Sequence, residues 1–365
     1  MLQAPLSRKA FLQKGWEGFL LAANKPHEPQ ATWKPPLLGH AYLRFRRPAM
    51  HTDFEVILDQ REGVEARRTA VAMLDEVDRL ESMLTLWSGR SELAEVNEQA
   101  SIHPVPVSEE LFALLLLARQ IFIETGGAYD LTSTPFSKCW GFFDRSGRMP
   151  SPVELEDARR LVGMEKVELD EARRTVFFRL PGMELNPASI GKGFALDCAI
   201  NLARNRGLRH VMMSGGFSSV LASGAPSWKS AWNISVRDPQ VPGCRAARLH
   251  LQDQGYSNSG SEAQQFTHEG RVFSHIIDPR TGWPALAGWN VSVVAPTAAL
   301  AEAWSTAFAV MGPSAACEAL RRHPEIGAMF LAPAGCEQGR EAICFNLNQS
   351  QVEVNESSWI RHETC

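Results

Sequence analysis

The segment at residues 186–195, just before a predicted helix, is the densest candidate for chemistry. It reads Asn-Pro-Ala-Ser-Ile-Gly-Lys-Gly-Phe-Ala. Small residues at a helix start let backbone N–H groups approach an anion, the helix dipole favours negative charge there, and Lys192 adds a positive charge. A phosphate would be stabilised at this point, although a glycine-assisted helix start with a solvated lysine explains the residues equally well. The GxxxxGK[ST] spacing of a P-loop is absent.

An acid and an alcohol on one face of a later helix form the second candidate. Glu302 and Thr306 stand four residues apart on the helix predicted after Pro296, so their side chains are neighbours. Hard cations such as Mg²⁺ select carboxylate and hydroxyl oxygens and often bridge to substrate phosphates. Such a pair is usually a surface feature, but its neighbours here are alanine, tryptophan and phenylalanine. A carboxylate in so apolar a helix needs a partner.

Two other segments contain residue types that occur in active sites. Residues 274–282 read Ser-His-Ile-Ile-Asp-Pro-Arg-Thr-Gly, in which Asp-Pro-x-Thr-Gly predicts a turn because proline fixes φ and glycine accepts positive φ. His275 lies beside this turn, although an isolated histidine is more often structural than catalytic. Residues 125–132 read Thr-Gly-Gly-Ala-Tyr-Asp-Leu-Thr, and a Ser-Glu-Leu run at 91–93 precedes them. Neither run identifies a reaction unaided.

The elements that must position these residues alternate between helices and strands. Apolar spacing, capping serines and terminal glycines predict helices at 69–84, 111–123, 152–162, 190–206, 298–311 and 314–322. Short apolar runs predict a hairpin over 167–179 and strands at 211–213, 219–222, 232–236, 291–294 and 328–331. Because no linker divides residues 41–345, we expect one large α/β or α+β domain with mixed sheets and surrounding helices. Residues 1–40 are expected to form an N-terminal arm and 346–365 a C-terminal tail.

Composition restricts the partners and leaves the compartment open. With 37 Lys+Arg against 41 Asp+Glu, the formal net charge of −4 gives no field that attracts nucleic acid or an anionic membrane. Seven scattered cysteines without CxxC spacing favour a reducing, cytoplasmic compartment. Residues 7–12 are similar to a twin-arginine export signal with lysine in place of the second arginine, so a periplasmic or envelope location is the alternative. No stretch approaches the ~20 apolar residues of a transmembrane helix.

Taken in order, these segments resemble the ApbE-type FAD:protein FMN transferases, and the resemblance runs from about residue 49 to 312. Each motif is weak alone, but eight in order are specific. The fold that the resemblance implies is a single ApbE-like domain related to the T-fold. The matching segments are Met50-His51-Thr52, Ser91 to Leu93 with Asn97, Gly127 to Thr132, Ile190 to Gly193 with Asp197, Ser214-Gly215-Gly216, Ser259-Gly260, His275 to Gly282, and Ala301 to Gly312.

The resemblance implies Mg²⁺-dependent transfer of FMN from FAD to a threonine or serine hydroxyl of an acceptor flavoprotein, with release of AMP. It assigns Mg²⁺ to the Ser189 carbonyl, Glu302 and Thr306. Lys192 would neutralise the diphosphate, and His275 would orient the cofactor or assist proton movement, which makes both catalytic. The residues implied in FAD binding are Met50, Trp87, Ala128, Tyr129, Asp130, Asn186, Lys192, His275 and Ile276.

Three positions depart from the family pattern. Trp87 stands where tyrosine is usual and still offers an aromatic face to the flavin. Asn186 replaces an aspartate before the glycine-rich turn. Glu302 replaces the aspartate metal ligand and is longer by one C–C bond of about 1.5 Å. Two other interpretations stay open: an Mg²⁺-dependent FAD pyrophosphatase that passes FMN to water, and a catalytically impaired FAD-binding protein.

Overall fold

The computed structural model describes residues 42–59, 62–86, 91–241, 243–261, 264–285, 288–332, 341–348, 350–354 and 359–363. The twin-arginine-like segment at residues 7–12 and Trp87 lie outside these ranges, so the interpretations of both stay predictions. Among the residues described, no helix combines the length and apolarity that crossing a membrane requires.

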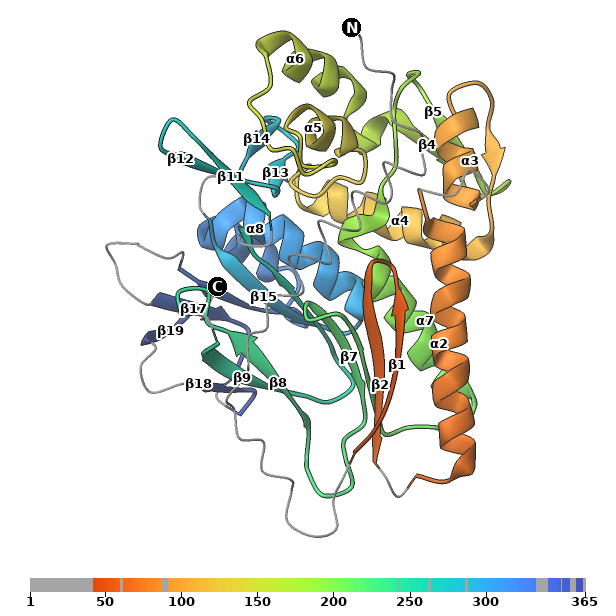
Figure 1. The fold of residues 1–365 in the computed structure, drawn as a ribbon, viewed down its shortest axis with the longest axis vertical. Coiled ribbons are helices and arrows are strands. Elements are labelled where there is room, and N and C mark those ends of the chain that lie inside the picture. Colours follow the sequence, from red (N-terminus) through yellow and green to blue (C-terminus); the bar gives the residue numbers. More distant parts are fainter. Residues whose placement is uncertain are drawn as a thin grey trace, which may run out of the picture. The chain divides into compact units, whose positions relative to one another are not determined.

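A large sheet forms the centre of the fold (Figure 1). Its neighbouring strands pair antiparallel, except for the last two, which are parallel. Within the described residues the order is β1 (Tyr42–Ala49), β2 (Thr52–Asp59), β6 (Val211–Gly215), β7 (Ser219–Ser223), β10 (Gly255–Ser259), β15 (Asn290–Ala295), β16 (Gly327–Leu331), β17 (Glu341–Phe345) and β19 (Trp359–Glu363).

Smaller sheets and ribbons surround it. One three-stranded sheet combines β8 (Trp232–Arg237), β9 (Arg245–Leu251) and β18 (Val352–Val354), and another combines β3 (Val105–Pro106), β5 (Thr175–Phe178) and β4 (Val167–Asp170). Two ribbons pair β11 (Gln265–His268) with β12 (Arg271–Ser274), and β13 (Ile277–Asp278) with β14 (Trp283–Pro284).

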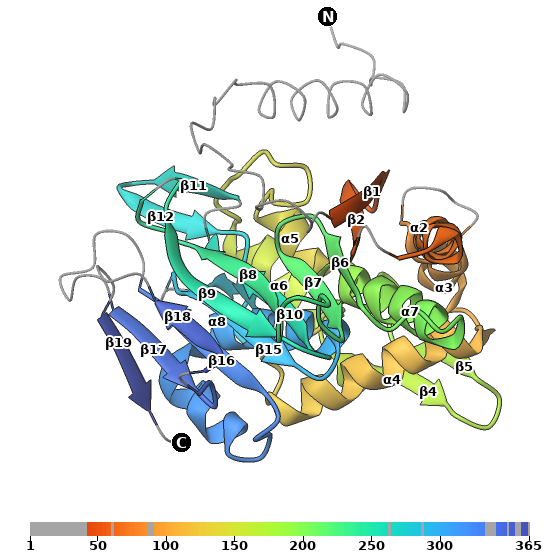
Figure 2. The ribbon, with the colours of Figure 1, turned by 90° about the horizontal axis from the view of Figure 1, so that it is seen from below.

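Among the described residues, the helices are α2 (Val64–Leu84), α3 (Glu92–Gln99), α4 (Glu109–Glu124), α5 (Thr134–Cys139), α6 (Pro152–Leu161), α7 (Gly191–Asn205) and α8 (Ala298–Leu320), with 3₁₀ turns η1 (Met164–Lys166) and η2 (Pro187–Ser189). Their apolar faces pack on the side of the large sheet that carries Phe54, Val56 and Val291, and this forms the main core. The opposite side, with Ile57 and Val294, packs against β8 and β9 to form a second core. The large sheet is therefore covered by helices on one face and by a small sheet on the other (Figure 2).

The predicted helices are present, because local signals determine their ends. Ser108 accepts a hydrogen bond from the Leu111 N–H at the start of α4, and Ser151 with Glu154 forms a capping box at the start of α6. The helices predicted at 298–311 and 314–322 are the two parts of α8, which is interrupted where Gly312 takes φ 73° and ψ 172°. Helix α2 starts five residues before the predicted position 69, at Val64.

The C-terminal residues differ from the predicted tail at 346–365. Strand β18 pairs antiparallel with β9, and β19 pairs parallel with β17 at one edge of the large sheet. These described residues are therefore parts of both sheets. Short strands that pair with segments far away in the sequence leave little local signal, which is why the sequence pattern did not indicate them.

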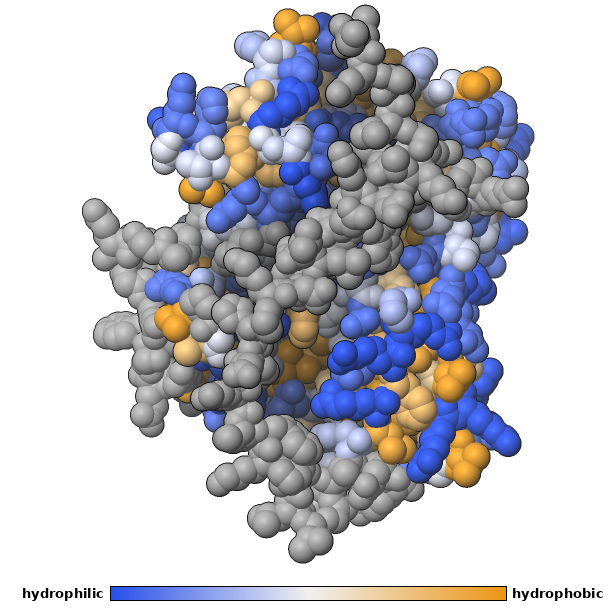
Figure 3. Space-filling model, in the orientation of Figure 1, coloured by the Kyte–Doolittle hydropathy of each residue, from blue (hydrophilic) through white to orange (hydrophobic). Residues whose placement is uncertain are grey.

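Strand β1 forms the other edge of the large sheet among the described residues, and its surface is charged. Arg44 pairs with Glu55 on β2 at 2.8 Å, and Arg47 contacts Asp75 and Asp78 on α2 at 2.7 and 2.6 Å. Figure 3 shows hydrophilic residues, interrupted by single hydrophobic ones, over the face that carries β1 and α2. Charged side chains on an edge strand oppose pairing with another chain.

Candidate active site

Helices α7 and α8 approach each other so closely that only glycine fits at the contact. A Cβ at Gly193 would lie 2.4 Å from the carbonyl oxygen of Ala298, and one at Gly255 on β10 would lie 2.5 Å from the Ala298 nitrogen. Neither position allows a side chain without movement of backbone. The start of α7, the start of α8 and strand β10 therefore meet at one place, which brings the two segments selected from the sequence together.

Each of these two helices supplies the carboxylate that caps the other. Asp197 on α7 accepts hydrogen bonds from the backbone N–H groups of Ala298 and Ala299, at 2.8 and 3.0 Å. Glu302 on α8 accepts one from the N–H of Gly193, at 2.7 Å. The N-cap residue of α7, Ile190, has no side-chain oxygen to do so. Removal from water raises the pKa of Asp197 to about 6.

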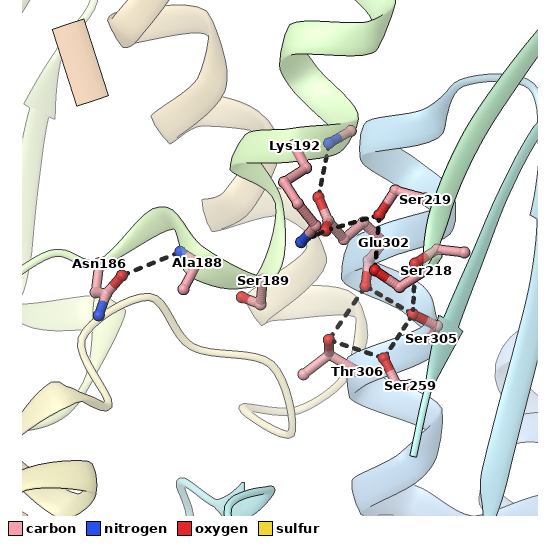
Figure 4. Close-up of polar contacts among 12 residues, drawn as sticks. Asn186, Ala188, Ser189, Lys192, Ser218, Ser219, Ser259, Glu302, Ser305 and Thr306 are labelled. Atoms are coloured by element: carbon pink, nitrogen blue, oxygen red, sulfur yellow. Dashed lines mark hydrogen bonds and ion pairs between the residues drawn. The ribbon is translucent and has the colours of Figure 1, made fainter. Parts of the chain in front are cut away.

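The carboxylate of Glu302 is buried and bonded on both oxygens (Figure 4). Its Oε1 forms an ion pair with Lys192 Nζ and accepts a hydrogen bond from Ser219 Oγ at 3.1 Å, while Oε2 accepts the Gly193 N–H. The Glu302 side chain is 5% exposed and that of Lys192 is 23% exposed. The partner that an acid in so apolar a helix requires is therefore Lys192, at the N-terminus of α7.

A group of hydroxyls from α8 and β10 lies around the backbone carbonyl of Glu302 (Figure 4). Thr306 Oγ1 and Ser305 Oγ donate to the backbone carbonyl of Glu302 at 3.1 and 2.9 Å. Ser259, at the end of β10, lies 2.8 Å from Ser305 Oγ and 3.4 Å from Thr306 Oγ1. Each hydroxyl keeps acceptor lone pairs for a further partner. The site thus joins a cation, a carboxylate and several hydroxyl oxygens.

Sequence reasoning missed Ser219 and Ser305 as site residues. Ser219 begins β7, pairs with Ser257 of β10 in the sheet and is fully buried. A buried serine opposite a carboxylate is recognisable only once strand and helix are packed together. Ser305 lies inside the Ala301 to Gly312 segment that the resemblance matched, which was the available signal for it, whereas nothing in the sequence pattern marked Ser219.

The Ala128–Asp130 segment is buried beside the glycine-rich turn. Ser189 Oγ, on η2, donates to the hydroxyl of Tyr129 at 3.3 Å, and burial raises the pKa of that hydroxyl. The Asp130 carboxylate accepts hydrogen bonds from Thr132 N–H and Oγ1 at 2.7 and 2.6 Å, and from Met164 N–H at 3.1 Å. Burial raises the pKa of Asp130 to about 6. This carboxylate therefore fixes the local chain, and its oxygens are already bonded to protein.

Asn186, which stands where aspartate was expected, still caps the turn before α7. Its side-chain oxygen accepts a hydrogen bond from the Ala188 N–H at 3.0 Å, and its own N–H donates to the carbonyl of Leu131 at 2.9 Å. An amide oxygen provides this cap as a carboxylate oxygen would. The turn before α7 is thus retained, and it is tied to the Ala128–Asp130 segment.

Met50 lies at the same end of the large sheet as Ser219. Met50 and His51 form the two-residue turn between β1 and β2, with φ of 48° and 62°, and the Met50 N–H donates to Glu81 at 2.8 Å. The sheet register connects the two positions: Phe54 pairs with Gly215, which pairs with Ser219. The structure therefore places the Met50 turn at the sheet end where the Glu302 site lies.

His275 and Ile276 belong to a separate ribbon region. The His275 backbone N–H donates to the Gln264 carbonyl, and the ring Nδ1 lies 3.1 Å from the same oxygen. Burial lowers the pKa of His275, so the ring is neutral at pH 7. Since a carbonyl can only accept, Nδ1 carries the hydrogen and Nε2 keeps a free lone pair. The described contacts do not connect His275 to Glu302, so its catalytic role stays a prediction.

Comparison with known proteins identifies the family. The FAD:protein FMN transferase of Salmonella typhimurium is 28% identical over 269 residues, which cover 71% of this chain and 77% of the relative. The FAD:protein FMN transferase of Treponema pallidum is 30% identical over 293 residues, which cover 76% of this chain and 80% of the relative. The crystal structure of the ApbE protein from Thermotoga maritima has a TM-score of 0.72 at 26% identity, covering 87% of this chain and 97% of its own. The apo flavinyl transferase ApbE of Pseudomonas stutzeri has a TM-score of 0.74 at 24% identity, covering 85% and 96%. Residues 50–330, well over half of the sequence, match the ApbE family, and the chain belongs to it.

Proposed function

We propose that this protein transfers the FMN group of FAD to a threonine or serine hydroxyl of an acceptor flavoprotein and releases AMP. The observation that carries the proposal is the meeting of Lys192 and Glu302 at the N-terminus of α7, with the Thr306 hydroxyl one turn further along α8 from Glu302. A helix N-terminus with a lysine suits a diphosphate, and the oxygen atoms beside it suit a cation. The names of the similar proteins agree with this chemistry.

The chemistry of the oxygen donors fits Mg²⁺. The candidate ligands are the Glu302 carboxylate, the Thr306 hydroxyl and the Ser189 carbonyl, all of which are hard oxygen donors. Three donors bind the Glu302 carboxylate in this structure: the Lys192 ammonium group and the Ser219 hydroxyl on Oε1, and the Gly193 N–H on Oε2. When bound, the ion would neutralise charge on the phosphate oxygens as the bond to AMP breaks.

The protein's own residues supply binding and proton handling in this proposal. Lys192 is 23% exposed, so its ammonium group can reach a phosphate oxygen that gains charge when AMP leaves. The acceptor hydroxyl forms the new P–O bond and loses its proton. We assign acceptance of that proton to Nε2 of His275, because the buried ring is neutral at pH 7 and this nitrogen has a free lone pair.

The test is an incubation with FAD, Mg²⁺ and an acceptor domain that carries the target threonine. Mass spectrometry should find AMP and an acceptor heavier by one FMN group, and neither in an acceptor with the threonine changed to alanine. Free FMN and AMP with no labelled acceptor would instead identify a FAD pyrophosphatase. FAD binding without AMP in any reaction would identify a flavin-binding protein.

Lys192→Ala and Lys138→Ala provide a matched pair of variants for this assay. Lys138 forms an ion pair with Glu184, outside the Glu302 cluster. We expect loss of AMP release for Lys192→Ala, by about two orders of magnitude, with little change for Lys138→Ala. Equal rates in the two variants would contradict the role of Lys192.

A further inference from the structure

The anion position that the sequence predicts at the start of α7 is filled by the protein's own carboxylate. Glu302 accepts the Gly193 N–H, the third residue of the helix, and pairs with Lys192, the second. These are the two groups expected to hold phosphate. Glu302 is also the expected carboxylate ligand of the metal. The Glu302 side chain therefore occupies the groups that would bind the phosphate. The same bonds occupy the carboxylate oxygens that would bind the metal.

The length of glutamate explains this arrangement. The carboxylate of Glu302 spans from α8 to the first turn of α7, with Gly193 on one oxygen and Lys192 and Ser219 on the other. An aspartate at the same Cα would be shorter by about 1.5 Å. A hydrogen bond of 2.7 Å stretched by that amount is no longer a hydrogen bond. The observed network is therefore specific to glutamate at position 302.

We propose that Lys192 is a built-in competitor of the metal for Glu302. A divalent ion must displace the Lys192 ammonium group from Oε1 before it binds this carboxylate, and the displaced ammonium group is then available to the diphosphate. This inference rests on the proposed function, since it concerns the same metal and the same substrate. It makes the Lys192–Glu302 ion pair the contact that metal binding must break.

Burial and exposure support this exchange. Glu302 is almost fully buried, so it requires a positive partner at all times, whereas Lys192 is partly exposed and has a route to solvent. The other two donors, Ser219 and the Gly193 N–H, are neutral and can stay in place when the cation changes. Of these three donors, the Lys192 ammonium group alone is positively charged, so it repels a metal ion that approaches Glu302.

The first experiment measures metal affinity without nucleotide. Isothermal titration with Mn²⁺ at pH 8 compares the wild-type protein, Lys192→Met and Lys138→Met, each checked for folding by circular dichroism. The Lys192 ammonium group occupies the carboxylate oxygen and carries the same sign of charge as the ion, so removing it should tighten Mn²⁺ binding by about tenfold or more. Lys138→Met, which breaks the ion pair with Glu184, should bind like the wild-type protein.

The outcomes separate this inference from the proposed function. Equal or weaker Mn²⁺ binding by Lys192→Met overturns the competition and leaves the metal assignment intact. No Mn²⁺ binding by any of the three proteins overturns the metal assignment and the competition with it. Tighter binding by both variants would reflect overall charge and would also overturn the competition.

A second experiment uses the wild-type protein and does not depend on a variant that folds. An amine-acylating reagent labels exposed lysines, and peptide mass spectrometry gives the rate for each one. Saturating Mg²⁺ should release Lys192 from Glu302 and raise its labelling rate severalfold, while the rate at Lys138 stays constant. An unchanged or lower rate at Lys192 overturns the displacement.

Discussion

Replacing Gly193 with alanine tests whether the crossing of α7 and α8 builds the site. The added Cβ would lie 2.4 Å from the Ala298 oxygen, 2.6 Å from its carbonyl carbon and 2.7 Å from Ala299 Cα. Ordinary contacts begin at 3.4 Å, so the closest approach falls short by about 1.0 Å (3.4 − 2.4). All three atoms are backbone at the capped start of α8, so no side chain can rotate away.

Relief of this overlap requires the two helices to separate. Overpacking of this kind costs typically 1–3 kcal/mol, and the separation also stretches the hydrogen bond from Gly193 to Glu302, which is worth about 1 kcal/mol or more. We expect a loss of about 3 kcal/mol in the free energy of unfolding. For a domain of this size that lowers Tm by roughly 5–10 °C.

Gly191→Ala is the matched control, two residues earlier in the same helix. A Cβ there meets its nearest atom, Leu84 Cδ1, at 3.6 Å, which is an ordinary contact. Alanine favours a helix over glycine by up to about 1 kcal/mol, so this variant should be as stable as the wild-type protein or more stable. Thermal unfolding followed by circular dichroism compares the three proteins. Equal Tm values for Gly193→Ala and Gly191→Ala would refute the packing argument.

Three further perturbations test other parts of the site. The pKa of Asp130 is raised from 3.8 to about 6, so its contribution to stability is present below pH 3.8 and is lost as the pH rises through about 6. The free energy of unfolding of the wild-type protein, measured relative to Asp130→Asn, should fall by about 3 kcal/mol between pH 4 and pH 7, and a difference independent of pH would contradict this. Thr306→Val keeps the shape of the side chain but removes its hydroxyl. AMP release should therefore fall by one to two orders of magnitude, while FAD affinity, measured by flavin fluorescence, changes little. Equal losses of AMP release and FAD affinity would argue against a role of Thr306 in metal binding. Glu302→Asp should lose the bond to the Gly193 N–H and lower the free energy of unfolding by about 1–2 kcal/mol in chemical denaturation, whereas unchanged stability would mean that the longer side chain is not needed.

The reciprocal capping of α7 and α8 connects stability with function. Asp197 and Glu302 are each held by backbone N–H groups of the other helix. Loss of either carboxylate leaves buried N–H groups without acceptors, which costs about 1–3 kcal/mol. Glu302 therefore has a structural role even before a cofactor binds, so variants at this position need a stability measurement beside any activity assay.

Local sequence determined most helices of this protein and the residue types of its site, although it did not indicate α3 and α5. The capping residues Ser108 and Ser151 and the break at Gly312 determine helix ends through contacts within a few residues, so spacing and composition reveal them. The resemblance selected Lys192 and Glu302 as functional residues, and both lie in the observed cluster. Strands such as β9, β10 and β18 left no comparable signal, because their partners are distant in the sequence.

Only the tertiary structure decided how the selected residues are used. The sequence indicated an anion site at Lys192 and a cation site at Glu302, yet packing of α7 on α8 joins them in one ion pair. Packing also added Ser219 to that pair and brought the Met164 N–H, 34 residues away in the sequence, to the Asp130 carboxylate. A sequence states which charges and hydroxyls exist and on which element each lies. Their partners follow from close packing between elements, where a difference of one C–C bond determines which atoms meet.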